Sequence, residues 1–218
     1  MDTVFNILEL IGVISFALSG AMLAIQNEMD ILGVCVLGSV TAVGGGITRD
    51  LLLGINPPAA FTDYTDVLIA ILVSIFIFLP FNQKLLRRKS HKAYDTVMLV
   101  ADSIGLGIFT VMGVNLSFSK PDAPSLFMSI FLGVITGVGG GVLRDIMAQQ
   151  KPYIFVKHFY ACAAMIGAAL CAVLRSYIGE FYATIVGFCI IFALRLLAAK
   201  FRWKLPKYER SFFEKQSK

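Results

Sequence analysis

Charged residues are scarce in this chain. Asp, Glu, Lys and Arg make up 15% of the 218 residues, whereas 57% are hydrophobic and the mean hydropathy is +0.79. Soluble domains carry about 25% charged residues, so this composition excludes an ordinary soluble domain and indicates an all-α integral membrane protein. The formal net charge of +5 does not indicate nucleic acid binding, because the basic residues gather in the breaks between apolar runs, where they orient membrane proteins.

Groups that bind metals or perform catalysis are scarce as well. The two histidines lie in basic connecting segments, and the four cysteines lie in apolar runs without metal-ligand or redox spacing. The cysteines are better interpreted as small buried hydrophobic residues, and the histidines lie far from any second type of ligand, so we expect no metal and no cofactor. The glycine-rich stretches lack the lysine of a nucleotide-binding loop, and no catalytic constellation is present. We therefore do not expect an enzyme.

Apolar runs long enough to cross a bilayer of about 30 Å define the organisation of the chain. We predict seven transmembrane helices, at residues 4–26, 31–54, 64–82, 95–118, 124–148, 157–178 and 181–200. A signal peptide has a basic segment before its apolar region. The first run has none, so we interpret it as a transmembrane helix. Residues 1–200 then form one transmembrane domain. Lys and Arg concentrate at 84–92 and in the tail 201–218, which predicts a cytoplasmic C-terminus and an outside N-terminus in the inner (plasma) membrane, with attraction to anionic membrane lipids.

The two halves of the chain resemble each other. At an offset of 93 residues Glu9 aligns with Asp102 and Phe16 with Phe109, and at an offset of 95 Arg49 aligns with Arg144. The repeats span 4–82 and 94–178, and the seventh helix, 181–200, has no counterpart. Each repeat holds three helices, an odd number, so the two must be inserted in opposite senses. This predicts the inverted-topology repeat found in many transporters.

Each repeat contains three adjacent glycines, then two other residues and then Arg-Asp. The glycines are Gly44, Gly45, Gly46, Gly139, Gly140 and Gly141. Small residues allow membrane helices to pack closely, which is one interpretation. The other is a kink that lines an aqueous path, since irregular backbone at membrane depth must face protein or water. We favour the kink, because close packing needs only one small residue per turn.

Ionisable side chains also lie inside the predicted spans, where each costs a few kcal/mol. They are Glu9, Arg49, Asp50, Asp102, Arg144 and Asp145. We predict two ion pairs, Glu9 with Arg49 and Asp102 with Arg144, one at each mouth of a path through the protein. The alternative is that the side chains near helix ends extend to the membrane interface.

Hydroxyl and aromatic residues occupy the middle of the same helices. The hydroxyl residues are Ser15, Ser19, Thr41, Thr110 and Thr136, and the aromatic residues are Phe16 and Phe109. Hydroxyls could replace part of the water shell of a cation, and a phenylalanine pair could form a hydrophobic constriction. Each hydroxyl could equally bond to the carbonyl one turn earlier in its own helix.

The doubled Gly-Gly-Gly-Ile-Thr-Arg-Asp and Gly-Gly-Gly-Val-Leu-Arg-Asp sequences, in two three-helix halves with a seventh helix, resemble the prokaryotic trimeric intracellular cation (TRIC) channel family. Its bacterial sequences are also grouped as a "glycine transporter" domain family. The resemblance implies a homotrimer in which each subunit has its own potassium-permeable pore, also open to other monovalent cations such as sodium. The first two helices of each half would line this pore, with kinks at the glycine triplets and with Arg49 and Arg144 beside it. Animal members carry a Lys-Glu-Val signature and bind a phosphoinositide; residues 47–50 differ here, so lipid regulation is not implied.

Two functions remain open at this point. A channel would pass an ohmic unitary current, whereas a secondary transporter of a small solute such as glycine, which an inverted repeat also permits, would show slow and saturable uptake. A third reading, a scaffold whose polar residues only pack, is weaker.

Overall fold

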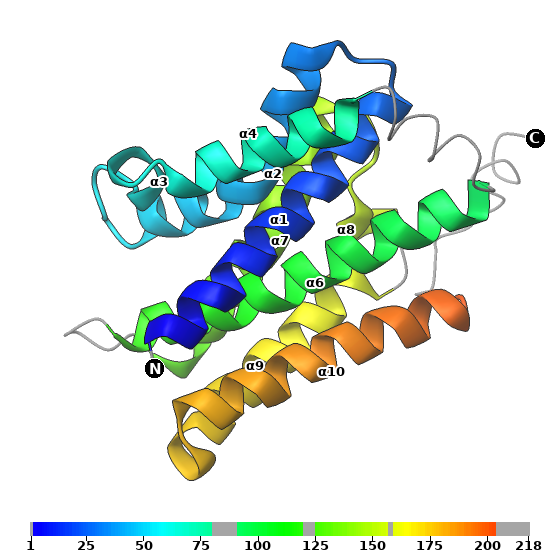
Figure 1. Cartoon of the computed structure of the whole chain (residues 1–218). Helices are drawn as coiled ribbons and strands as arrows, with labels where there is room; N and C mark the ends of the chain where they lie inside the picture. Colours follow the sequence, from blue (N-terminus) through cyan, green and yellow to red (C-terminus); the bar gives the residue numbers. More distant parts are fainter. Residues whose placement is uncertain (1, 80–90, 120–124, 157–158, 204–218) are drawn as a thin grey trace, which may run out of the picture.

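The computed structural model describes residues 2–79, 91–119, 125–156 and 159–203, and regular secondary structure in these ranges is helical throughout. The helices are α1 (Asp2–Gln26), α2 (Ile31–Leu52), α3 (Ala59–Thr62), α4 (Thr65–Phe78), α6 (His91–Phe118), α7 (Leu126–Met147), α8 (Tyr153–Val156), α9 (Tyr160–Ile178) and α10 (Glu180–Lys200) (Figure 1). Six of them, α1, α2, α6, α7, α9 and α10, are long and apolar enough to cross a membrane. The chain is therefore a multi-pass helical membrane protein.

The observed boundaries differ from the predicted ones in a few places. The predicted helix at 64–82 corresponds to the shorter apolar helix α4, and residues 80–82 lie outside the described residues. The short helices α3 and α8 were not predicted, because single turns carry no hydrophobic periodicity. Asp30 and Ser125 cap α2 and α7 by accepting hydrogen bonds from the backbone N–H groups of Gly33 and Met128. Most of the basic segment 84–92 and nearly all of the tail 201–218 lie outside the described residues.

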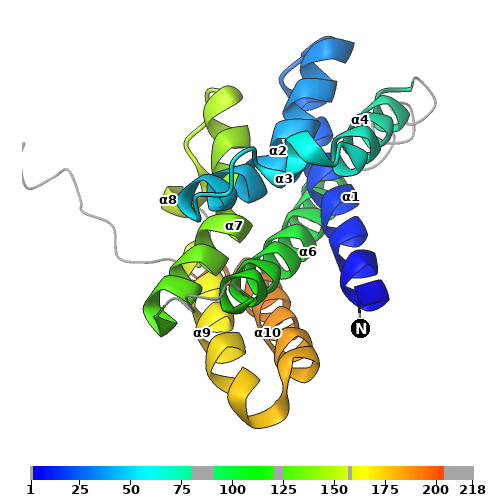
Figure 2. The ribbon, with the colours of Figure 1, turned by 90° about the vertical axis from the view of Figure 1, so that its left-hand side faces the viewer.

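Four long helices form the middle of the molecule (Figure 2). α1 packs on α2 and α6, and α7 packs on α2 and α6; α4 lies against α1 and α2, and α9 with α10 lies against α6 and α7. α1 and α6 are antiparallel, because Gly12 faces Phe109 and, one turn later in α1, Phe16 faces Gly105. Equivalent residues thus exchange equivalent contacts, as expected of two repeats related by a twofold axis.

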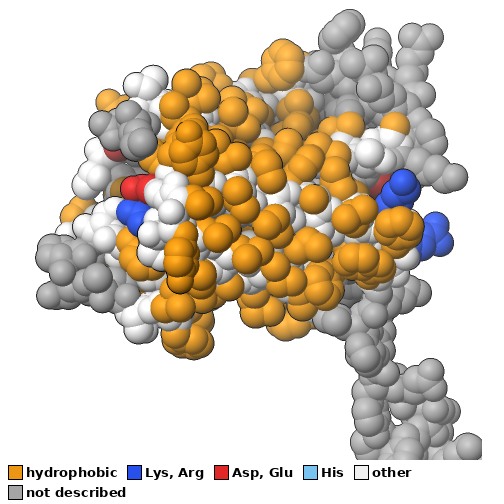
Figure 3. All heavy atoms as spheres, turned by 90° about the horizontal axis from the view of Figure 1, so that it is seen from below, with side chains coloured by type: hydrophobic (Ala, Val, Ile, Leu, Met, Phe, Trp, Pro, Cys, Tyr) orange, Lys and Arg blue, Asp and Glu red, His pale blue; other side chains and the backbone are white. Residues whose placement is uncertain are grey.

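The outer surface is apolar over a broad area. Figure 3 shows one face covered by hydrophobic side chains, with the visible charged side chains gathered near its two edges. Large side chains exposed there in a water-soluble protein would be costly, whereas acyl chains solvate them. The surface therefore agrees with a lipid-facing belt, and the polar side chains are directed inward.

Candidate functional site: two charged clusters on either side of a phenylalanine pair

The glycine triplets form the crossing between α2 and α7. A Cβ atom added to Gly45 would overlap the backbone carbonyl oxygen of Thr136, and one added to Gly140 would overlap that of Thr41. Both helices continue without interruption through their triplets. These contacts therefore agree with close helix packing at the glycines, whereas a kink at the glycines stays a prediction.

Phe16 and Phe109 meet beside this crossing. Their ring centroids are 5.3 Å apart and the rings are stacked, and both side chains are buried. Phe16 follows Glu9 by two helical turns in α1, and Phe109 follows Asp102 by two turns in α6, about 10 Å in each case. Because the two helices are antiparallel, the phenylalanine pair lies between Glu9 and Asp102. Each of these acids belongs to a charged cluster: Glu9 lies near Arg49 and Asp50 (the first-repeat cluster), and Asp102 lies with Arg144 and Asp145 (the second-repeat cluster).

The second-repeat cluster confirms one predicted ion pair. Arg144 Nη1 lies 2.7 Å from Asp102 Oδ1 and donates to Ser19 Oγ at 2.5 Å. Arg144 Nε donates to Asp145 Oδ1 at 2.9 Å, and the other oxygen of Asp145 accepts the backbone N–H of Tyr153 at 2.7 Å. The side chains of Arg144, Asp102 and Asp145 are 0% exposed, so three charges are held together without solvent.

A fourth charge in this cluster comes from α10. Arg195 Nη2 lies 3.4 Å from Asp102 Oδ2, and its guanidinium carbon is 4.5 Å from the centre of the Tyr160 ring. Arg195 is 1% exposed. Neither Arg195 nor Tyr160 was predicted from the sequence as a site residue. The signal was present for the first, since an arginine inside the apolar run 181–200 is itself a candidate functional residue.

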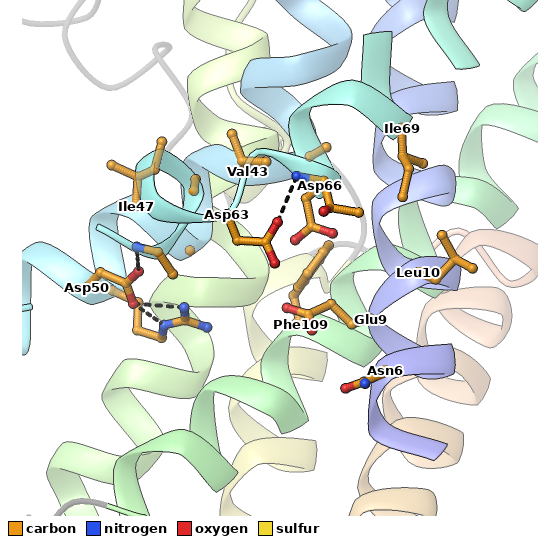
Figure 4. A pocket seen from close by; sticks show the side chains of 16 residues that line it. Asn6, Glu9, Leu10, Val43, Ile47, Asp50, Asp63, Asp66, Ile69 and Phe109 are labelled. Carbon is orange, nitrogen blue, oxygen red and sulfur yellow. Dashed lines mark hydrogen bonds and ion pairs between the residues drawn. The ribbon is translucent and has the colours of Figure 1, made fainter. Parts of the chain in front are cut away.

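The first-repeat cluster differs from its mate, and the predicted pair of Glu9 with Arg49 is wrong. Among the described residues no ion pair joins these two; Arg49 Nη2 instead lies 2.7 Å from Asp50 Oδ1. Asp50 Oδ2 accepts the backbone N–H of Ala59 at 2.9 Å, which fixes the carboxylate beside Arg49. Figure 4 shows Glu9 and Asp50 on different sides of a pocket, and the carboxylate that pairs with Arg49 is that of its neighbour Asp50.

This pocket is a cavity of about 520 Å³. Its lining includes Glu9, Asp63, Asp66 and the Arg49–Asp50 pair, and it reaches Phe109 (Figure 4). Hydrogen bonds from Thr65 hold the pKa of the Asp63 carboxyl below its usual range, so Asp63 is ionised at neutral pH. Asp63 and Asp66 were missed by the sequence reasoning, because they lie at the entry to a helix, where acidic residues are ordinary.

The threonine hydroxyls at the crossing bond within their own helices. Thr41 Oγ1 donates to the Leu37 carbonyl and Thr136 Oγ1 to the Leu132 carbonyl, each at 2.6 Å. This is the alternative that the sequence left open. Ser19 belongs to the second-repeat cluster, whereas the remaining predicted hydroxyls, Ser15 and Thr110, are buried.

The chain is similar to known membrane proteins over most of its length. The family model described as glycine transporter matches residues 6–82 and 99–176. The inner membrane protein YadS of Escherichia coli K12 is 35% identical over 203 residues, covering 92% of this chain and 94% of YadS. The membrane protein YvgT of Bacillus subtilis is 36% identical over 208 residues, covering 95% of this chain and 97% of YvgT.

Solved structures decide the family. A structure of a TRIC cation channel is 38% identical, superposes with a TM-score of 0.82 and covers 94% of this chain and 98% of its own. The TRIC orthologue from Rhodobacter sphaeroides is 31% identical, with a TM-score of 0.83, and covers 92% and 100%. The chain belongs to the TRIC family. The stretches matched by the glycine transporter model fall on α1 to α4 and on α6 to α9, and they leave out α10 with Arg195.

Proposed function

We propose that this TRIC protein is a cation channel of the inner membrane that conducts chiefly potassium. The observation that carries the proposal is the acidic cavity ending on Phe109, in a chain so similar to solved TRIC cation channels. The pore runs between α1, α2, α6 and α7, and each subunit of a homotrimer contains one.

The charges of the cavity give it cation preference. Four carboxylates and one guanidinium are among its lining residues: Glu9, Asp50, Asp63, Asp66 and Arg49. A cleft lined by one sign of charge between low-dielectric walls concentrates the field and raises the local concentration of counter-ions. Potassium ions would therefore accumulate in front of the phenylalanine pair.

The phenylalanine pair and the second-repeat cluster form the barrier. Stacked rings exclude water, and a hydrophobic constriction blocks ions by dewetting. Beyond them, Arg144 is bound to two carboxylates and is fully buried. We infer that the structure represents a closed channel and that opening requires movement at the α2–α7 crossing, where kinks at the glycine triplets would allow it.

The arrangement in the membrane is part of the proposal. Seven spans, with α4 as the third, would form two inverted repeats followed by α10. The reciprocal antiparallel contacts of α1 with α6 support this topology. The Lys-rich and Arg-rich segments at 84–92 and 201–218 support a cytoplasmic C-terminus and an outside N-terminus.

A planar-bilayer recording of the purified protein tests the function. We expect discrete unitary currents that depend linearly on voltage near zero, with a reversal potential that follows the potassium gradient. Replacing potassium by a large organic cation on one side should abolish the current from that side. Absence of unitary currents from protein that is folded would contradict the channel.

A second candidate is a secondary transporter of glycine, which the description of the matching family favours. Proteoliposomes loaded with unlabelled glycine should then exchange it for labelled glycine with saturation, and without unitary current. The same preparation used for the bilayer recording serves both measurements, so one result supports the channel and the other supports the transporter.

A further inference from the structure

The two repeats carry the same three charges in different surroundings. Each has an acid on its first helix and an Arg-Asp pair on its second, so each trio has a net charge of −1. The second-repeat trio, Asp102, Arg144 and Asp145, is fully buried. The first-repeat trio borders a cavity, and Arg49 is 14% exposed.

Electrostatics explains this difference. Burying an uncompensated charge is strongly unfavourable, whereas a balanced, hydrogen-bonded set can be kept dry. Arg195, which lies 3.4 Å from Asp102 and is buried itself, brings the second cluster, as far as the described residues form it, to two guanidinium groups and two carboxylates. At the first cluster, α4 and the residues just before it add acids instead, Asp66 and Asp63, so that cluster has to remain hydrated.

We propose that Arg195 is a gate residue, because its charge balances the second-repeat cluster and allows this mouth of the pore to close without water. The seventh helix has no counterpart in the repeats, so it is the element that makes the two mouths unequal. Arg195 acts through Asp102 and Arg144 and is a positioning residue, which need not touch a permeating ion. The inference rests on the proposed channel function.

Arg195→Met removes the charge and keeps much of the side-chain volume. The cluster is left with a net charge of −1, which favours a hydrated mouth, and we expect the open probability in planar bilayers to rise about tenfold or more. Arg195→Lys keeps the charge and should stay near the wild type. Open probability unchanged in Arg195→Met would overturn the proposal.

The matched control is Arg175→Met. Arg175 on α9 donates to Asn115 of α6 at 2.9 Å and to Glu180 at 2.9 Å, so it joins the same group of helices without touching Asp102. Its loss costs packing and hydrogen bonds of a similar kind. If Arg195 served only to hold helices together, both variants would lower stability and neither would change gating.

The double variant Asp102→Asn/Arg195→Met tests the charge balance itself. It leaves Arg144 opposite Asp145, a neutral pair, and should return the open probability toward the wild-type value. The double variant should also fold if Arg195→Met alone does not, because a neutral cluster can be buried. Open probability as high in the double variant as in Arg195→Met would overturn the proposal, and so would failure of both to fold while Arg195→Lys folds.

Water access can be measured without any current. In a background whose four native cysteines are replaced, Ser19→Cys places a thiol within the second-repeat cluster. We expect a charged thiol reagent to label it slowly, and much faster once Arg195→Met is added. Equal labelling would refute the role of Arg195, whereas a wild-type protein without unitary currents would refute the channel and leave the labelling result valid.

Discussion

Adding one methyl group to Gly45 should separate α2 from α7. The added Cβ would overlap the carbonyl oxygen of Thr136, which is backbone and cannot rotate away. Ordinary contacts between a carbon and a carbonyl oxygen are about 3.3–3.6 Å, so the helices have to move apart by roughly 1 Å. The same outcome is expected for Gly140→Ala, whose added atom would meet the backbone carbonyl of Thr41.

The expected cost follows from packing. A radial gap of about 0.5–1 Å forfeits a quarter to a half of the dispersion attraction across a contact, and overpacking typically costs about 1–3 kcal/mol. Alanine is the better helix former by about 1 kcal/mol, which offsets part of this. The difference is about 0–2 kcal/mol. Because dispersion attraction is also lost along the whole crossing, we expect Gly45→Ala to lower the free energy of unfolding by an amount in the upper half of this range, about 1–2 kcal/mol.

Gly46 supplies the matched control within the same triplet. Within the described part of the chain, an added Cβ there meets only Arg49 Nη2, at 3.7 Å, which is an ordinary contact. Gly46→Ala should therefore be neutral, or stabilising by up to about 1 kcal/mol. Thermal unfolding of the purified protein in detergent, followed by size-exclusion chromatography, compares both variants with the wild type under one condition.

The comparison separates close packing from flexibility. If the triplets mattered only as flexible points, alanine at either position would have similar effects on stability and on current. Equal melting temperatures for Gly45→Ala and the wild type would refute the contact argument. A loss at Gly46→Ala as large as at Gly45→Ala would refute it as well.

Three further predictions concern the proposed pore. Glu9→Gln should reduce the potassium conductance by about a third to a half in 0.1 M KCl and have little effect in 1 M KCl, where charges are screened within about 3 Å. Phe109→Ala should raise the unitary conductance by removing one face of the barrier, at a stability cost of up to about 3–5 kcal/mol that thermal unfolding would reveal. Thr136→Val should leave the potassium-to-sodium reversal potential unchanged and alter stability by less than about 1 kcal/mol, because the hydroxyl bonds to the Leu132 carbonyl of its own helix.

Each of these has a contrary result. An equal effect of Glu9→Gln at both salt concentrations would mean that Glu9 does not act through the field of the cavity. Unchanged conductance in Phe109→Ala would place the barrier elsewhere. A shifted reversal potential in Thr136→Val would mean that the Thr136 hydroxyl contacts permeating ions.

The helices and their pairing were accessible from the sequence for a simple reason. Long apolar runs reflect a solvent that satisfies no backbone hydrogen bond, so hydropathy alone located the long helices. The offset that aligns Glu9 with Asp102 also aligns Phe16 with Phe109, and these two rings are stacked at 5.3 Å. Asp102 with Arg144 was predictable in the same way, because isolated charges at membrane depth need partners.

Tertiary structure decided the difference in ion pairing and burial between the two clusters. The alignment of the two halves predicted that Glu9 would pair with Arg49 as Asp102 pairs with Arg144. Arg49 instead forms its ion pair with Asp50, whose carboxylate is held in place by the backbone N–H of Ala59. Sequence alone gave no distance between Arg195 and Asp102, which are 93 positions apart. The sequence by itself thus determined a membrane protein of two matching halves, because burial and periodicity are local properties. Which cluster is buried and which borders a cavity depended on charges from separate helices meeting in space, because electrostatic balance is a property of the assembled fold.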